Sequence, residues 1–212
     1  MLKLQLIVGS TRQGRHADAV LRWLAPVVQA HGAFALDILD LRDWSLPMFQ
    51  ETVAAMGDLR APTFSDPVVQ RWNAKIKDAD AYLIVTPEYN HSIPAVLKNA
   101  IDSVFFTYGF RHKPVAFVGY SLGVTAAARA VEHLGQVMLE TEAMPVRTTV
   151  LIPVVTTAFD ANGAPTSPML GVGLNVMLDD LAWLGHALQT ARVAGEPPPA
   201  AVRIRAVAVQ HR

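Results

Sequence analysis

The sequence contains no cysteine among its 212 residues. Disulfide bonds, thiolate-bound metals, thiolate-held iron–sulfur clusters and cysteine nucleophiles are therefore excluded together. Charge is also scarce, because charged residues make up 17% of the chain and 18 basic side chains balance 18 acidic ones. The chain lacks the overall field that would attract nucleic acid or an anionic membrane, so neither is expected as a partner.

Long hydrophobic runs are missing as well. No apolar run reaches the roughly 18–20 residues that span a bilayer, and no signal-peptide pattern opens the chain, so a cytoplasmic protein is expected. Hydrophobic residues nevertheless make up 51% of the chain, which is ample for a core. We expect one domain over residues 1–192 and a proline-rich tail over residues 193–212, whose segment 195–199 cannot be regular structure.

Apolar runs and periodicities predict an alternation of strands and helices. Five strands are expected, over residues 2–8, 34–41, 81–86, 114–120 and 146–153. Helices are expected from residue 17, with a kink or early end near Ala25 because of Pro26, and also from Asp66, from Pro94, over 126–139 and over 169–192. Residues 42–65 indicate a long loop, and residues 201–212 either an edge strand or a disordered end. This alternation is typical of an α/β protein with a parallel sheet and helices on both faces.

The turn over residues 9–15 lies between the first strand and the first helix. Free N–H groups at a helix start and the helix dipole favour a negative charge there. Hydroxyl and guanidinium groups in the turn suit a phosphate monoester, and they come from Ser10, Thr11, Arg12 and Arg15. A polar turn with solvated arginines is the alternative, because the turn matches neither GxGxxG nor GxxxxGK[ST].

A second turn, over residues 86–92, follows the third strand and is expected at the same sheet edge, where doubly wound proteins bind ligands. Tyr89 offers a ring for stacking, and Asn90, His91 and Ser92 offer hydrogen bonds to a flat aromatic ligand. Glu88 also fits an ordinary acid near a helix start, and His91 an ordinary solvated loop residue.

Two motifs of this sequence occur together. The first is Gly9-Ser10-Thr11-Arg12, and the second is the long segment 87–102, which begins Pro-Glu-Tyr-Asn-His-Ser. Together they resemble the NADPH-dependent FMN reductase family, which includes azo-, quinone- and chromate-reducing members, over nearly the whole chain. The resemblance implies a three-layer, flavodoxin-like, doubly wound sheet of five parallel strands in the order 2-1-3-4-5.

The resemblance also implies a noncovalent FMN and a set of residues that contact it. The phosphate would be held by the first turn, at Ser10, Thr11, Arg12, Arg15 and His16. The isoalloxazine would lie along Pro87, Glu88, Tyr89 and Asn90, with His91 and Ser92 nearby. A loop after the fourth strand, residues 119–125, would border the ring through Tyr120, Ser121 and Gly123.

Two departures from the family pattern stand out. Related first loops often carry a serine and an asparagine where this chain has Arg15, His16 and Asp18, which predicts a more cationic phosphate site. The loop after the fourth strand is usually richer in glycine, whereas this chain continues with three alanines at residues 126–128. A different approach to the ring, or fewer backbone donors, is expected there.

The activity that the resemblance implies is a ping-pong reduction. NADPH, or NADH, passes a hydride to FMN, and a small acceptor such as a flavin, quinone, azo compound or metal oxyanion is then reduced. No catalytic side chain is assigned, although Tyr89 and His91 are candidate proton donors beside bulk water, and no metal site is expected. The 2′-phosphate of NADPH needs a cation, for which Arg15, Arg111 and His112 are candidates.

Three alternatives share parts of this pattern. A flavodoxin-type electron carrier would have the same fold and cofactor, but such carriers use acidic fields that this chain lacks. A regulatory or scaffold protein would keep the fold without flavin. Residues 119–123 also match the esterase pattern G-x-S-x-G, although no later acid and histidine form a clear partner set.

Aromatic residues cluster after the helix that follows the second turn. Phe105, Phe106, Tyr108 and Phe110 are more than one buried face can take, which fits a subunit interface. The family resemblance implies dimers and sometimes tetramers, so a homodimer or homotetramer is expected.

Overall fold

The computed structural model describes residues 1–58, 61–200, 202–204 and 207. Its strands are β1 (Leu2–Val8), β2 (Phe34–Asp40), β3 (Ala81–Pro87), β4 (Pro114–Tyr120), β5 (Met144–Pro145) and β6 (Val150–Ile152). Its helices are α1 (Ala17–Ala30), α2 (Val53–Met56), α3 (Pro67–Lys77), α4 (Ala95–Asp102), a 3₁₀ turn (Phe105–Thr107), α5 (Ala128–Glu140) and α6 (Pro168–Ala194). Among the described helices none is long and apolar enough to cross a membrane.

All strands of the sheet run parallel, in the order β2-β1-β3-β4-β5, and β6 also pairs with β4. The predicted order is therefore confirmed. The fifth predicted strand, residues 146–153, forms only over β6, and β5 lies just before its predicted start; Pro145 lies opposite Val115 whereas Val150 lies opposite Val118. The chain advances by five residues from Pro145 to Val150, whereas β4 advances by three from Val115 to Val118. The residues in excess therefore bulge out of the ladder between β5 and β6.

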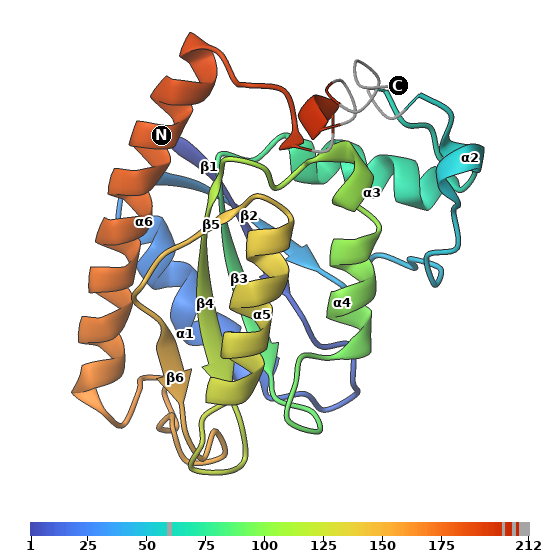
Figure 1. Ribbon diagram of the computed structural model, residues 1–212. Helices are drawn as coiled ribbons and strands as arrows, with labels where there is room; N and C mark the ends of the chain where they lie inside the picture. Colours follow the sequence, from blue (N-terminus) through green and yellow to red (C-terminus); the bar gives the residue numbers. More distant parts are fainter. Residues whose placement is uncertain (59–60, 201, 205–206, 208–212) are drawn as a thin grey trace.

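Helices cover both faces of the sheet (Figure 1). On one face, α1 and α6 pack against the even-numbered apolar residues of β1, and Val20, Leu24 and Leu178 belong to this core. On the other face, α3, α4 and α5 pack through residues such as Trp72 and Leu134. β3 and β4 are buried along their whole length, as near-continuous apolar runs in a covered parallel sheet must be.

Several boundaries differ from the predictions. α1 continues through Pro26, which is exposed, and Arg22, the residue whose carbonyl Pro26 cannot bond, is exposed as well. The predicted loop 42–65 contains the short helix α2, whose cap is Thr52. Residues 202–204 of the tail lie in a helical turn that starts at Pro199, not in an edge strand, and residues 201, 205–206 and 208–212 lie outside the described residues.

The carboxyl ends of β1, β3, β4 and β6 lie at one edge of the sheet, the lower end in Figure 1. The loops that follow these strands therefore meet there, as they do in doubly wound proteins that bind ligands at that edge. Arg111 and His112 precede β4 and lie at the opposite end, where Arg111 pairs with Glu142 and His112 Nδ1 lies 2.7 Å from Glu196.

Candidate functional site

A cleft of about 580 Å³ opens at the carboxyl edge of the sheet. Three segments form it, which we call the first loop (residues 9–16), the second turn (residues 87–92) and the third loop (residues 121–127). Of the predicted site residues, the cleft brings together Arg12, Arg15, His16, Pro87, Glu88, Tyr89, Asn90, Tyr120, Ser121 and Gly123. Ser10, Thr11, His91 and Ser92 do not line it.

The first loop is fixed close to the second turn. Gly9 has no room for a side chain, because a Cβ there would lie 2.9 Å from Leu97 Cδ2 and 3.0 Å from the Val85 carbonyl. Ser10 is buried, and its hydroxyl lies 2.9 Å from the hydroxyl of Tyr89. Ser10 therefore ties the first loop to the second turn instead of facing the cleft, and Thr11 is exposed outside it.

Arg15 has a structural role that the sequence did not reveal. Its side chain is 2% exposed, and its guanidinium forms ion pairs with Asp40 and Asp18 and donates to the Ser10 carbonyl. Burial works to raise the pKa of Asp40, but hydrogen bonds and charge from Arg15 and Arg42 outweigh it and lower that pKa. Arg15 lines the cleft as predicted, but two carboxylates already pair with its guanidinium, so its contact with a phosphate stays a prediction.

Arg12 is the arginine of the first loop that remains exposed to a ligand. Its guanidinium lies 3.7 Å from the centre of the Tyr89 ring, which is a cation–π contact. His16 is half-buried beside it and precedes the first turn of α1. Arg12 and the amino end of α1 therefore supply the positive charge at this end of the cleft.

The second turn is a tight reversal held by its own backbone. Tyr89 and Ser92 form two hydrogen bonds of 2.9 and 3.1 Å, and Asn90 and His91 have φ values of 50° and 67°. Asn90 tolerates that left-handed conformation better than most residues. Glu88 lines the cleft with 6% of its side chain exposed and is paired with Arg129, which the alternative of an ordinary acid near a helix start does not explain.

Sequence reasoning missed two residues of α5 that contact the second turn. Arg129 pairs with Glu88, and its Nη1 lies 2.9 Å from His91 Nε2. His133 Nδ1 lies 3.1 Å from the hydroxyl of Ser92. The one available signal was the spacing of Arg129 and His133, four residues apart on one helix face directly after the third loop.

The third loop keeps a glycine-like backbone with alanines. Ala126 and Ala127 have φ values of 53° and 68°, a region that alanine adopts at a cost of roughly 1–2 kcal/mol per residue. Tyr120, just before the loop, is buried at 3% exposure, and burial together with Tyr89 raises its pKa. The left-handed conformations of Ala126 and Ala127 therefore place backbone strain in the third loop.

The esterase pattern does not form a catalytic pair. The hydroxyl of Ser121 donates to the Gly123 carbonyl at 2.9 Å, while His91 and His133 contact Arg129 and Ser92. Within the described residues no histidine makes a hydrogen bond to Ser121. Ser121 thus lacks the general base that a serine nucleophile needs.

Unpartnered polar atoms are concentrated in the cleft. Within the described residues, five buried side-chain polar atoms have no hydrogen-bond partner, and three of them belong to cleft-lining residues: Glu88 Oε2, Tyr120 OH and Arg129 Nε. Such atoms are rare in folded proteins and point to a polar ligand. A flavin mononucleotide, with a phosphate, ribityl hydroxyls and a polar ring edge, fits these groups and Arg12.

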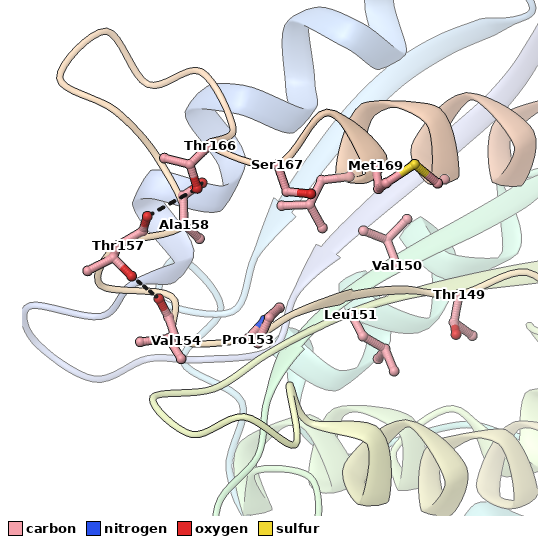
Figure 2. A pocket seen from close by; sticks show the side chains of 12 residues that line it. Thr149, Val150, Leu151, Pro153, Val154, Thr157, Ala158, Thr166, Ser167 and Met169 are labelled. Atoms are coloured by element: carbon pink, nitrogen blue, oxygen red, sulfur yellow. Dashed lines mark hydrogen bonds between the residues drawn. The ribbon is translucent and has the colours of Figure 1, made fainter.

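A second cavity of about 540 Å³ lies between β6 and the start of α6 (Figure 2). Its lining combines apolar side chains such as Val150 and Met169 with hydroxyls, and within the described residues it includes no ionisable side chain. Thr157 and Thr166 turn their hydroxyls to backbone carbonyls at 3.2 Å (Figure 2). None of the predicted site residues lies in this second cavity.

The three candidates for the NADPH phosphate lie in two places. Arg15 lines the cleft but is bound by carboxylates, whereas Arg111 and His112 lie at the opposite end of the sheet. Arg111 and His112 are therefore wrong as candidates, because the fold separates the start of β4 from its end. No group of three or more histidine or acidic side chains in the described part of the chain is arranged to hold a metal ion.

Comparisons with known proteins agree on one family. A family model described as NADPH-dependent FMN reductase matches residues 2–157. An NAD(P)H-dependent FMN reductase of Pseudomonas aeruginosa is 35% identical over 165 residues, which cover 76% of this chain and 83% of that protein. A quinone reductase of Escherichia coli is 32% identical over 146 residues, covering 67% of this chain and 73% of that protein.

A solved structure has the same fold over most of this chain. The flavoenzyme FerB, an NAD(P)H:acceptor oxidoreductase of Paracoccus denitrificans, superimposes with a TM-score of 0.71 at 25% identity. The match covers 88% of this chain and 98% of FerB.

Proposed function

This chain belongs to the NADPH-dependent FMN reductase family and is an NAD(P)H-dependent flavin oxidoreductase, and we propose that the cleft between its three loops is the site of a ping-pong reduction. NADPH delivers the hydride, and a small acceptor such as a quinone, flavin, azo compound or metal oxyanion receives it. The observation that carries the proposal is the set of unpartnered polar atoms of Glu88, Tyr120 and Arg129 within this cleft.

FMN, when bound, supplies the hydride transfer, and the residues of this chain bind and orient it. Arg12 and the amino end of α1 would hold the phosphate. Arg12 carries a positive charge, the helix end has a positive dipole, and neither is paired with a carboxylate within the described residues. Ser10 and Arg15 would support this end indirectly, since Ser10 fixes Tyr89 and Arg15 fixes the loop backbone.

The ring end of the cleft is formed by the second turn and the third loop. Pro87, Tyr89 and Asn90 would lie along the isoalloxazine, and Tyr120 OH and Glu88 Oε2 would take hydrogen bonds from the cofactor. Ser121 and Gly123 border the same end. His91 and Ser92 face α5, so they would hold the turn and not the flavin.

A single open cleft supports the alternation of substrates. The nucleotide and the acceptor would reach the flavin from the same side, so the oxidised nucleotide must leave before the acceptor binds. Tyr89 is the better placed of the two candidate proton donors, because it lines the cleft while His91 does not. We propose a homodimer or homotetramer in the cytoplasm, in which Phe105, Phe106 and Tyr108 contact a second copy, since all three are half-buried.

The decisive experiment is a visible spectrum of the purified protein followed by anaerobic addition of NADPH. We expect the absorption bands of oxidised flavin, which bleach when NADPH or NADH is added and return when a quinone is supplied. Bands that no pyridine nucleotide bleaches would support an electron carrier instead. A colourless protein that fails to take up added FMN would contradict the proposal.

Arg12 offers a direct test of the phosphate assignment. Arg12→Ala removes a charged donor, and hydrogen bonds to charged groups contribute about 1.5–3 kcal/mol, so FMN binding should weaken about 10- to 100-fold. Arg71, an exposed residue of α3 with no hydrogen bond or ion pair within the described residues, provides the matched control Arg71→Ala. Equal affinities of the two variants would place the phosphate elsewhere.

A further inference from the structure

Arg129, the second residue of α5, contacts both sides of the cleft. Its guanidinium pairs with Glu88, its Nη1 lies 2.9 Å from His91 Nε2, and its Nη2 lies 3.3 Å from Thr125 Oγ1. Glu88 and His91 belong to the second turn, whereas Thr125 belongs to the third loop. One side chain therefore connects the two segments that would enclose the flavin ring.

The charge of Arg129 balances a carboxylate that is nearly out of solvent. Only 6% of the Glu88 side chain is exposed, whereas 40% of the Arg129 side chain is. A buried carboxylate without a cation is strongly unfavourable, and Arg129 is its ion-pair partner within the described residues. Removal of Arg129 would therefore disturb Glu88 more than the exposure of the arginine suggests.

The hydrogen-bonding capacity of the Glu88–Arg129 pair is only partly satisfied within the described residues. Glu88 Oε1 accepts from Arg129, but Glu88 Oε2 and Arg129 Nε are buried without partners in the described part of the chain. Both residues line the cleft. A pair that served packing alone would have no reason to leave these two atoms unsatisfied beside a cavity.

The contact with His91 determines which nitrogen of that ring carries the proton. A guanidinium only donates hydrogen bonds, so His91 Nε2 must accept and the ring proton must be on Nδ1. One helical turn further on, His133 contacts Ser92. One face of α5 therefore holds two consecutive side chains of the second turn.

We propose that Arg129 is a positioning residue for the flavin: it neutralises Glu88 and holds the second turn, so that Glu88 Oε2 accepts a hydrogen bond from an N–H or O–H donor of the cofactor. This inference rests on the proposed function, because the cofactor is the one assigned there. It adds a helix, α5, to the loops that determine the flavin site.

The ligand-free protein provides the first test. Nitrogen NMR of the histidine rings should show His91 as the Nδ1–H tautomer in the wild type, and Arg129→Met should abolish this preference. Arg71→Met, on α3, should leave it unchanged. A His91 tautomer that is the same in the wild type and in Arg129→Met would overturn the positioning role.

The second test measures FMN affinity by fluorescence quenching, with thermal unfolding of each apoprotein to confirm folding. Arg129→Met should weaken binding about tenfold or more, because it leaves a buried carboxylate unpaired. Arg129→Lys should recover part of the loss, since lysine keeps the charge but lacks the planar fork that reaches Glu88 and His91 together.

The double variant E88Q/R129M separates coupling from independent effects. The double variant lacks both charges, so no uncompensated carboxylate remains. It should therefore bind FMN at least as well as Arg129→Met alone. Losses that multiply in the double variant, or an Arg129→Met affinity within twofold of Arg71→Met, would overturn the inference. A wild type that does not bind FMN would overturn the proposed function, and the histidine tautomer would still decide whether Arg129 holds the turn.

Discussion

Two cavities of nearly equal size lie on either side of the segment 153–157. The cleft measures about 580 Å³ and the second cavity about 540 Å³, and Val155 lines the first while Val154 lines the second. Backbone hydrogen bonds from Val154 and Val155 to Gly123 and Ser121 join this segment to the third loop. The two cavities therefore share a wall but differ in chemistry.

The difference lies in how many polar groups are left for a ligand. The cleft has three guanidinium groups, those of Arg12, Arg15 and Arg129, together with a buried carboxylate and three unpartnered polar atoms. The hydroxyls of Thr157 and Thr166 in the second cavity are already bonded to backbone carbonyls. Cavity volume alone does not identify a site, whereas unsatisfied polar groups do.

The largest expected effect comes from Arg15, which supports the first loop beneath the cleft. Arg15→Met would leave Asp40 without its buried partner and should lower the free energy of unfolding by about 2–3 kcal/mol, because breaking a buried ion pair is costly and Asp40 is only partly exposed. Thr149→Val in the second cavity should change it by less than about 0.5 kcal/mol. Chemical denaturation of both variants checks this difference.

The pH dependence of that effect has a definite sign. The pKa of Asp40 is lower in the folded chain, so its contribution to stability is present above the ordinary carboxyl pKa and disappears as the pH falls through the folded value. The stability gap between wild type and Arg15→Met should therefore be widest at neutral pH and should narrow as the pH falls below the ordinary carboxyl pKa. A gap that stays constant on acidification would show that Asp40 is not the partner that matters.

A pair of glycines sharpens the comparison. Gly119 is next to the cleft, and a Cβ there would lie 2.9 Å from Val131 Cγ2 and 3.1 Å from the Ala126 carbonyl, so Gly119→Ala should destabilise by about 1–3 kcal/mol. At Gly173, beside the second cavity, the nearest atom is Val150 Cγ2 at 3.9 Å. Gly173→Ala should stabilise by about 0.5–1 kcal/mol, because it removes a helix-interior glycine.

Thermal unfolding of the two alanine variants, with and without FMN, distinguishes the two regions. Gly119→Ala should also weaken FMN binding, since it displaces the third loop, whereas Gly173→Ala should not. If both variants lower affinity equally, the second cavity belongs to the same functional unit as the cleft.

A further expected effect concerns the shared wall. Val154 has a φ of 42°, a left-handed conformation that a β-branched residue adopts only with strain. Val154→Asn should therefore raise the free energy of unfolding by about 1 kcal/mol, because asparagine tolerates this conformation. FMN affinity within twofold of wild type would show that the strain serves neither cavity, and a larger loss would show that it shapes the cleft.

The strands and their parallel arrangement could be predicted because the evidence for them is local, whereas their order in the sheet came from the family resemblance. Each central strand is a short apolar run such as residues 81–86, and Asp66 with Pro67 marks the start of α3 by a cap that the structure confirms. The break between β5 and β6 was missed because a bulge depends on register with β4, not on composition.

The candidate site could be predicted only as a set of loops. The resemblance placed Arg12, Glu88 and Tyr89 at one edge of the sheet, where the cleft contains them. It could not show that Arg15 pairs with Asp40 or that Glu88 pairs with Arg129, because those partners lie 25 and 41 positions away in the sequence. Which charges remain free for a ligand is a property of the assembled fold.

The contact between Glu88 and Arg129 also bears on when the protein can acquire its cofactor during synthesis. Chains emerge from the ribosome from the amino end, so the first loop and the second turn are exposed before α5 has been translated. The link between Ser10 and Tyr89 already spans 79 positions, and the Glu88 link requires a further 40 residues of growth. A nascent chain shorter than residue 129 therefore has the first loop and the second turn but not the Glu88–Arg129 contact, so the proposed flavin site stays incomplete until α5 has been translated.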